Sequence, residues 1–438
     1  MATACDQRKV TAIAAVRLSG DILCLLRNKK TAAARHRVSW PSIPSQCRGA
    51  GAGVVLLRGD EMLHKRMAML LLGLALGAEA APQLLQGHIG NAAVVMELTI
   101  EPDGQVDGRY FYRRYHRDLA LSGKRQADGS LQLGENLHYD EVRSDLTLHP
   151  QNGGWVGEWH GPKAAKALAV SLSPYAREQW PASSDSALHP VRQRSGYDYV
   201  RMVDLPLKAG KRERVQGHTL QWWEEPVSKI RLFRVLDGYP EASLQRLNQQ
   251  LAERQWQEVA SYFDCQLGGV RAAGADFEQT ITPRLLGSKL FSVSIFTSYY
   301  CGGAHPDFAD NPLNLEVGSG RELQLEDLLW LGKGKPLLAR KPGGERTDFQ
   351  YEEHVQAPWL AHTMARLYPT DSQPGQDDDC NYRDPQVWQF VSWYATPQGL
   401  YLGPSFARVA RACEYPAWSV LPWPLVKQHA GARAELLP

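Results

Sequence analysis

The stretch FSVSIFTSYYCGGAHPD, residues 291–307, joins a strand pattern to a glycine-rich loop in this 438-residue chain. Large apolar residues alternate with serines over residues 291–295, which is the period of two expected of a β-strand with one buried face. After Cys301 the alternation stops, because two consecutive glycines allow unusual backbone conformations and Pro306 favours an extended conformation of His305. The sequence therefore predicts a strand that ends in a loop of defined shape.

The candidate binding residues lie at the end of this strand and in the loop after it. They are Tyr299, Tyr300, Gly302, Gly303, His305 and Asp307. His305 is the strongest candidate, because its charge can change near neutral pH and loops carry function more often than strands do. The alternative is a histidine that only holds the loop in place through hydrogen bonds. One histidine without a positioned carboxylate or nucleophile does not make a catalytic site, so we predict no catalytic residue here.

Residues 62–80, MLHKRMAMLLLGLALGAEA, have the basic start, short apolar run and Ala-x-Ala end of a secretory signal peptide. The apolar run is about half of the ~20 residues that a bilayer-spanning helix needs. We therefore predict cleavage after Ala80, a periplasmic or secreted product and no stable membrane anchor. Because a signal peptide belongs at an N-terminus, we interpret residues 1–61 as an over-long reading of the coding sequence that is disordered. The alternative is a long, unusual export leader.

Removal of residues 1–80 changes the charge balance of the chain. That segment holds 12 basic and 5 acidic residues, so the remainder has 37 basic and 42 acidic residues and a net charge of −5 instead of +2. A chain with this balance has no excess of positive charge for a phosphate backbone. The composition therefore argues against nucleic-acid binding.

Four cysteines remain after the signal peptide, and an even number in an exported chain favours disulfides. Proximity in the sequence suggests that Cys265 pairs with Cys301 and Cys380 with Cys413, which is one of three possible pairings. Zinc is the competing use of four cysteines, but no two of them have the close spacing of a zinc site. The sequence also lacks a phosphate-binding loop, a His-Glu-x-x-His motif and a nucleophile elbow. We therefore expect neither a metal nor a cofactor.

The spacing of turn signals indicates the fold of residues 82–175. Asp-Gly or Asn-Gly pairs occur at residues 103–104, 128–129 and 152–153, with a short apolar strand pattern between each pair and the next. This spacing predicts an antiparallel β meander or a small barrel. The aromatic residues at 110–115 are compatible with a ligand groove, but aromatic residues at strand spacing more often belong to a core.

The rest of the chain has a mixed pattern. Residues 176–196 are small, polar and proline-bearing, which predicts a linker. Residues 197–430 alternate strand patterns with two helical ones, at about 240–263 and 352–368, and indicate an α+β domain with helices packed on an antiparallel sheet. A strand is expected at residues 386–394, and residues 431–438 form a tail.

Two motifs in this second half point to a known family. The run YYCGGAHP at residues 299–306 and the run GSGRELQLEDLL at residues 318–329 resemble the extracytoplasmic C-terminal domain of RsiV-type anti-sigma factors. This domain of unknown function also accompanies some secreted peptidoglycan deacetylases. The resemblance covers about residues 225–430 and implies a binding or sensing module in the cell envelope, since the anti-sigma relatives recognise lysozyme. Residues 406–413 depart from the family pattern, and no counterpart of the deacetylase catalytic domain is present.

Two functions follow from these observations. The favoured one is an exported cell-envelope binding or sensing module that recognises peptidoglycan fragments or a lysozyme-like protein. The alternative is an envelope hydrolase with His305 as general base and an acid supplied by Asp307 or Asp310. We favour binding because the sequence gives the histidine no identifiable orienting partner, and the enzymatic alternative stays open.

Overall fold

A computed structural model describes residues 81–135, 144–162, 166–270, 274–336, 340–341, 344–345, 349–373 and 380–438. The predictions for residues 1–61 and for the signal peptide at 62–80 lie outside the described residues. Among the helices within the described ranges, none has both the length and the apolar composition needed to span a bilayer.

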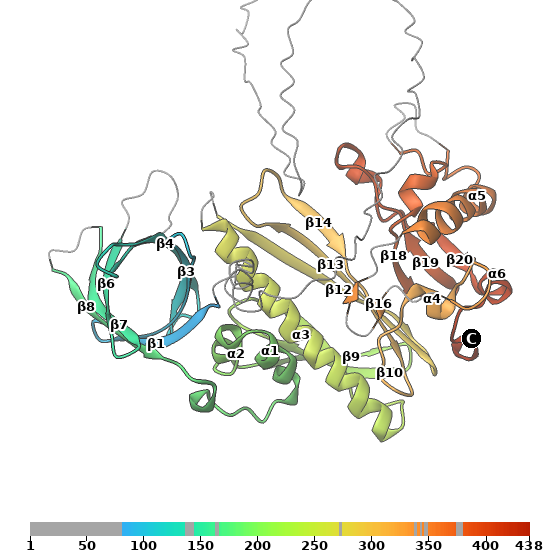
Figure 1. The fold of residues 1–438 in the computed structure, drawn as a ribbon. Helices are drawn as coiled ribbons and strands as arrows, with labels where there is room; N and C mark the ends of the chain where they lie inside the picture. The colour runs from blue at the N-terminus through green and yellow to red at the C-terminus, as the bar shows by residue number, and fades with distance from the viewer. Residues whose placement is uncertain are drawn as a thin grey trace, which may run out of the picture. The chain divides into compact units, whose positions relative to one another are not determined.

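Eight antiparallel strands at the start of the described chain close into a barrel, in which the last strand pairs with the first (Figure 1). Gly104, Gly129 and Gly153 have φ values of 84°, 82° and 76° in three of its turns, where a side chain would be strained. The predicted meander is therefore confirmed as a closed barrel. Its strands are β1 Gln83–Ile89, β2 Ala92–Ile100, β3 Gln105–Tyr112, β4 Asp118–Arg125, β5 Leu131–Glu135, β6 Asp145–Gln151, β7 Gly154–His160 and β8 Leu168–Pro174.

The barrel interior is a packed core of side chains. Tyr110 points into it and is fully buried, together with Met96 and Leu121. The Tyr110 hydroxyl donates to Glu135 Oε1 at 2.5 Å, and Trp159 Nε1 donates to the same oxygen at 2.7 Å. The next residue, Phe111, is buried on the outside of the barrel. Both aromatic residues therefore belong to cores, as their strand spacing suggested.

The segment predicted as a linker, residues 176–196, is structured. It contains 3-10 helices at Arg177–Gln179 and Ser186–Leu188 and the helix α1 His189–Arg194, and it leads into α2 Gly196–Met202. Its small and apolar residues occupy a core between the outside of the barrel and helix α3, Glu241–Gly269. This core includes Val95, Phe111, Ala187, Leu188, Val191, Val259 and Phe263. The sequence of this segment resembled a linker because its few buried residues do not recur with the period of a helix or a strand.

Ion pairs join the barrel to α2 and α3, and those with α2 are buried. The fully buried Arg201 of α2 places Nη2 2.5 Å from Asp118 Oδ1 at the start of β4. Arg109 of β3 lies 3.1 Å from Glu97, 3.6 Å from Asp198 of α2 and 3.3 Å from Asp264 of α3. Removing one partner of a buried pair leaves an uncompensated charge, so these contacts fix which surfaces meet.

Replacing Arg201 by Met tests this joint. The change leaves Asp118 buried without its cation, and we expect the free energy of unfolding to fall by about 3–5 kcal/mol. Urea unfolding followed by tryptophan fluorescence measures the loss. Lys211→Ala is the control, because Lys211 pairs with Glu213 on the surface at 2.7 Å and its loss should cost about 0–1 kcal/mol. Equal losses in the two variants would contradict the assignment.

The second half is α+β, as predicted, and α3 runs along its sheets (Figure 1). Phe291, Val293 and Ile295 form the apolar face of β13 and pack with Leu247 and Leu251 of α3. The alternation read from the sequence is therefore present. The strands are β9 Lys208–Val215, β10 His218–Glu224 and β11 Arg231–Val235 in one sheet, and β12 Asp276–Leu286, β13 Leu290–Tyr300, β14 Asp307–Asp310 and β15 Leu313–Glu316 in the next.

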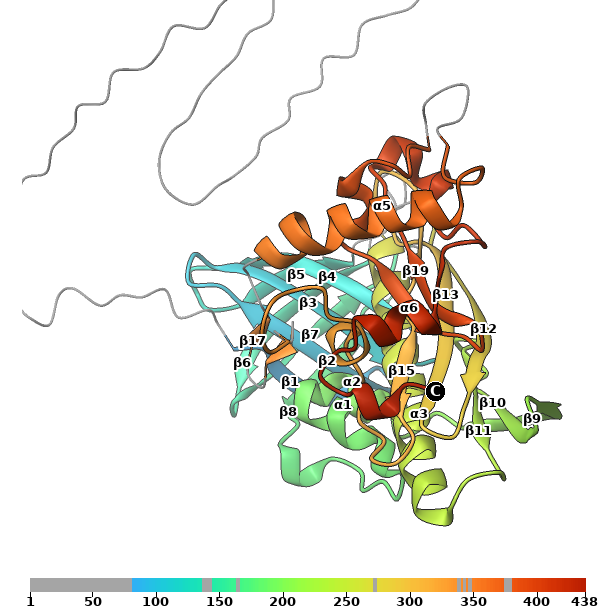
Figure 2. The same cartoon turned by 90° about the vertical axis from the view of Figure 1, so that its right-hand side faces the viewer.

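The serine face of β13 is buried as well, which corrects the expectation of a single buried face. Ser292 and Ser294 are each 1% exposed, because a C-terminal layer covers them. In this layer α6 lies beside β19 and β20 (Figure 2). Its elements are α4 Leu325–Leu328, α5 Ala357–Leu367, β18 Ser392–Ala395, β19 Gly399–Gly403, β20 Val420–Pro422 and α6 Trp423–Gln428.

Three details of the C-terminal layer differ from the sequence-based expectation. The helix predicted at 352–368 begins as a π-helical turn, Glu352–Gln356, and continues as α5 with Pro358 in its first turn. The strand predicted at 386–394 is a 3-10 helix, Pro385–Trp388, followed by β18. The expected tail contains the 3-10 helix Ala434–Leu436 and is fastened to β15 by Arg433, whose Nη2 lies 2.7 Å from Glu316 Oε1. Short two-residue strands also pair at Arg340–Lys341 and Gly344–Glu345.

Candidate functional site

Both predicted disulfides are present. Cys265 bonds to Cys301 and Cys380 bonds to Cys413. The first bond fastens the last turns of α3 to the residue that follows β13. Gly268 permits this close approach, because a Cβ at that position would lie 2.5 Å from the carbonyl oxygen of Cys301. The loop after β13 is therefore anchored at its first residue.

The six predicted binding residues lie at the end of β13, in the loop after it and at the first residue of β14. Tyr299 and Tyr300 end β13 and are half-buried, Gly302 has a φ of 85°, and Gly303 and His305 are exposed. In the part of the chain that the structure describes, His305 has no hydrogen bond or ion pair. None of the six lines either of the two cavities described below. Their role in binding stays a prediction.

The carboxylates named for the hydrolase alternative have other partners. Asp307 Oδ1 lies 3.0 Å from Arg411 Nη2 and 3.2 Å from Arg408 Nη1. Arg408 Nη2 also donates to the carbonyl oxygen of Pro306 at 2.6 Å, and Arg411 donates to that of Phe308. These contacts hold the far end of the loop against the 3-10 helix Arg408–Cys413. We call this set of contacts from Arg408 and Arg411 the arginine clamp.

Loss of the arginine clamp should loosen the loop without unfolding the domain. In the double variant Arg408→Gln/Arg411→Gln we expect amide hydrogens of residues 302–308 to exchange about fivefold faster, since opening then costs about 1 kcal/mol less. Hydrogen exchange read by mass spectrometry measures this. Arg383→Gln, a change at a nearby exposed arginine, is the control and should leave the loop unchanged. Unaltered exchange in the double variant would show that the disulfide alone fixes the loop.

A cavity of about 340 Å³ lies where β12 and β13 meet the C-terminal layer. Thr280, Thr282 and Arg284 alternate along β12, so they share one face, and the first two lie opposite Phe296 and Ser294 of β13. The register shifts between Pro283 and Leu285, which makes Arg284 the extra residue of a β-bulge. We call this cavity the tyrosine pocket; it is lined by Thr280, Thr282, Arg284, Ser294, Phe296, Asp310, Tyr394, Tyr401, Tyr415 and Ala417.

Three tyrosines give the pocket its aromatic wall. Tyr394 and Tyr401 are a cross-strand pair of β18 and β19, and their rings stack with centroids 4.4 Å apart. Burial raises the pKa of Tyr394 to about 12, so its hydroxyl stays neutral and can both donate and accept hydrogen bonds. Tyr415 has a φ of 59°, which is rare for a bulky residue. Its ring packs on Phe296 and its hydroxyl accepts from the Asp310 backbone N–H at 2.9 Å.

Two charged side chains complete the pocket. Arg284 lies over the Tyr394 ring, 4.6 Å from Cζ to the ring centroid, and donates from Nη2 to Ser294 Oγ at 3.4 Å. Ser294 in turn donates to Asp310 Oδ2 at 2.7 Å, while Asp310 Oδ1 accepts from the Ile295 N–H at 2.9 Å. Burial raises the pKa of the Asp310 carboxyl, and the hydrogen bond from Ser294 opposes this shift. Ser294 therefore separates the cation from the carboxylate.

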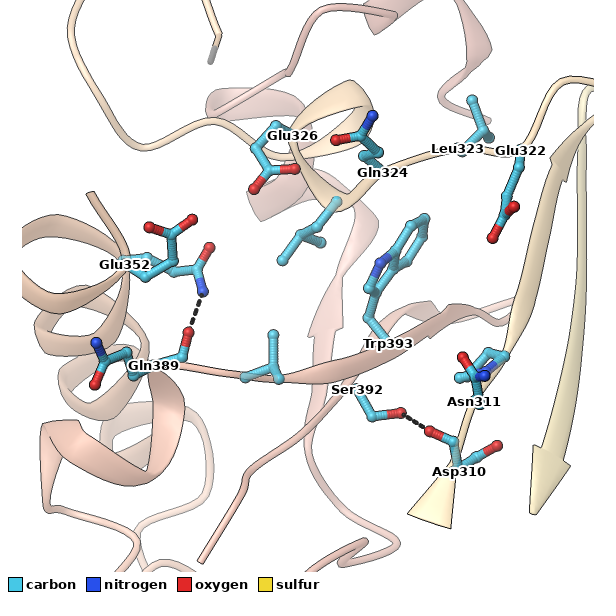
Figure 3. Close-up of a pocket in the computed structure, with 14 residues that line it drawn as sticks. Asp310, Asn311, Glu322, Leu323, Gln324, Glu326, Glu352, Gln389, Ser392 and Trp393 are labelled. Atoms are coloured by element: carbon cyan, nitrogen blue, oxygen red, sulfur yellow. Dashed lines mark hydrogen bonds between the residues drawn. The ribbon is translucent and has the colours of Figure 1, made fainter. Parts of the chain in front are cut away.

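A second cavity, of about 390 Å³, is also lined by Asp310 (Figure 3). Glu326 of α4, Glu352 of the π-helical turn and Trp393 of β18 line this cavity (Figure 3). Among the described residues, no group of three or more His, Cys, Asp or Glu side chains is placed to hold a metal ion. We call this cavity the acidic cleft; it is lined by Asp310, Asn311, Pro312, Glu322, Leu323, Gln324, Leu325, Glu326, Glu352, Gln356, Gln389, Val391, Ser392 and Trp393.

Neither a comparison with protein-family models nor a search of curated proteins finds a match to this chain. The site is therefore identified by its geometry. The sequence predictions missed the tyrosine pocket, although the Thr-x-Thr-x-Arg spacing at residues 280–284 was a usable signal for one polar strand face. The tyrosines gave no such signal, because they lie more than a hundred residues from β12 in the sequence.

The Asp310 carboxyl should make stability depend on pH. Because its pKa is raised in the folded state, the protonated form stabilises the fold, and this contribution is lost as the pH rises above the usual value of 3.8 and through the folded-state pKa. Asp310→Asn cannot ionise. We therefore expect its free energy of unfolding, relative to wild type, to rise between pH 4 and pH 7 in urea titrations. A constant difference over that range would contradict the assignment.

Proposed function

We propose that this chain is an exported cell-envelope binding module and that the tyrosine pocket binds a fragment of wall glycan. The observation that carries this proposal is the composition of the pocket. Neutral tyrosine and threonine hydroxyls, an aromatic wall and one arginine line a cavity with the volume of a small-molecule site. Saccharides present many hydroxyl groups and apolar ring faces, so this lining offers partners for both.

Three further observations support a role in the envelope. Two disulfides are typical of an oxidising compartment. Residues 62–80 have the pattern of a secretory signal peptide. The runs at residues 299–306 and 318–329 resemble a domain found in envelope sensors. The hydrolase alternative is less well supported, because His305 has no carboxylate partner within the described residues and both oxygens of Asp310 accept hydrogen bonds from the sheet.

Binding of soluble peptidoglycan fragments by the purified full chain, measured by calorimetry, tests the proposal. We expect Tyr394→Phe to keep its fold and to bind about fivefold more weakly, since one hydroxyl hydrogen bond worth about 0.5–1.5 kcal/mol is lost. Tyr262→Phe is the matched control, because Tyr262 is a half-buried tyrosine that does not line the pocket.

Two results would count against this proposal. One is the absence of binding by the wild-type chain. The other is an equal loss in the Tyr262 control, which would mean that the Tyr394 hydroxyl is not the contact. Binding of a lysozyme-like protein, with no binding of glycan, would move the site to the exposed loop that contains Gly303 and His305.

A further inference from the structure

Arg284 makes no direct contact with the carboxylate of its pocket, Asp310, to which Ser294 links it. In the described part of the chain, Arg284 forms no ion pair, and its Nε is buried without a hydrogen-bond partner. Its guanidinium contacts the Tyr394 ring and donates one long hydrogen bond, to Ser294. Buried cations in proteins are ordinarily paired with an anion. The guanidinium therefore has donors that remain available to a ligand.

We propose that the ligand of the tyrosine pocket is a saccharide that bears a carboxylate, and that Arg284 binds this carboxylate. This inference rests on the proposed function and names the chemical class of its ligand. The planar guanidinium presents parallel N–H groups that match the two oxygens of a carboxylate. The guanidinium packs over the ring of Tyr394, and the β-bulge at Arg284 directs the side chain toward the pocket.

Asp310 limits the charge that the pocket accepts. It lies in the same cavity and is linked to Arg284 through Ser294, so its ionised form opposes an incoming anion. A pocket that contains one cation, Arg284, and one carboxylate, Asp310, suits a ligand with a single negative charge better than a phosphate dianion. The geometry therefore favours a carboxylate over a phosphate ester as the anionic group of the sugar.

The size of the pocket restricts where the carboxylate sits on the ligand. A volume of about 340 Å³ is at the lower end of small-molecule sites, which fits one sugar unit better than a long glycan. The hydroxyl of Tyr394 is then available to the same unit that Arg284 binds. The carboxylate therefore belongs to the sugar ring or to a short substituent on it, such as a uronic acid or a lactyl ether.

Binding of four disaccharides to the full chain tests this inference by calorimetry. They are N-acetylglucosaminyl-N-acetylmuramic acid, its methyl ester, a disaccharide that contains a uronic acid, and neutral chitobiose. We expect the free lactyl acid to bind at least tenfold more tightly than its ester. The disaccharide with a uronic acid distinguishes the two kinds of sugar carboxylate. If it binds as tightly as the lactyl acid, the pocket recognises any sugar carboxylate. If it binds more weakly, the pocket is specific for the lactyl ether.

Variants connect the preference to Arg284. Arg284→Gln should remove the tenfold preference for the acid over its ester, and Arg284→Lys, which keeps the charge without the paired donors, should retain part of it. Asp310→Asn should strengthen the preference for the acid over its ester severalfold. Arg231→Gln is the control, because Arg231 is an exposed strand arginine outside the pocket.

The outcomes separate the two proposals. Equal binding of acid and ester by the wild-type chain, or a preference that persists in Arg284→Gln, overturns the carboxylate inference while glycan binding stands. Failure of the wild-type chain to bind any of the four disaccharides overturns the inference together with the proposed glycan site.

Discussion

Two buried serine hydroxyls on β13 connect this strand to its neighbours and to the C-terminal layer. Ser292 donates to Asn314 at 2.7 Å and accepts from the Ala395 N–H at 3.1 Å, which ties β13 to β15 and β18. Ser294 links Arg284 to Asp310. A buried hydroxyl without partners would be costly, but these two are paired on both sides, and their small size lets the C-terminal layer approach closely. The tyrosine pocket and the acidic cleft both lie along this contact and share Asp310.

The same serines show how far the sequence could be interpreted. The alternation at residues 291–295 and the Asp-Gly and Asn-Gly turns predicted a strand and a β meander, because period and turn chemistry are local properties. Proximity of cysteines predicted both disulfides. The covered serine face could not be predicted, since serine is as compatible with solvent as with a hydrogen-bonded core. The pairing of Arg284 with Tyr394 was equally hidden, because it depends on a bulge and on a strand far away in the sequence.

The barrel has a different role from the C-terminal layer. Its interior is filled by buried side chains, and its buried carboxylate, Glu135, already accepts hydrogen bonds from Tyr110 and Trp159. Its outer face carries Phe111, the ion pair of Asp118 with Arg201 and the ion pair of Arg109 with Asp198. Burying charges costs solvation energy, so such pairs specify how two surfaces meet more than they stabilise them. These contacts suit a barrel that supports α2 and α3, whereas the tyrosine pocket lies at the contact between β12, β13 and the C-terminal layer.

A rigid contact of this kind suits the proposed recognition of a ligand. The Cys265–Cys301 bond anchors one end of the loop after β13, and the arginine clamp, joined to Cys380 through Cys413, anchors the other. Phe308, just beyond the clamp, packs against both Phe296 and Tyr415 of the tyrosine pocket. Tyr415 keeps an unfavourable backbone conformation, which persists only where the surroundings determine it. A pocket whose walls are fixed before the ligand arrives loses little conformational entropy on binding, so even a few hydrogen bonds and one ion pair can give useful affinity.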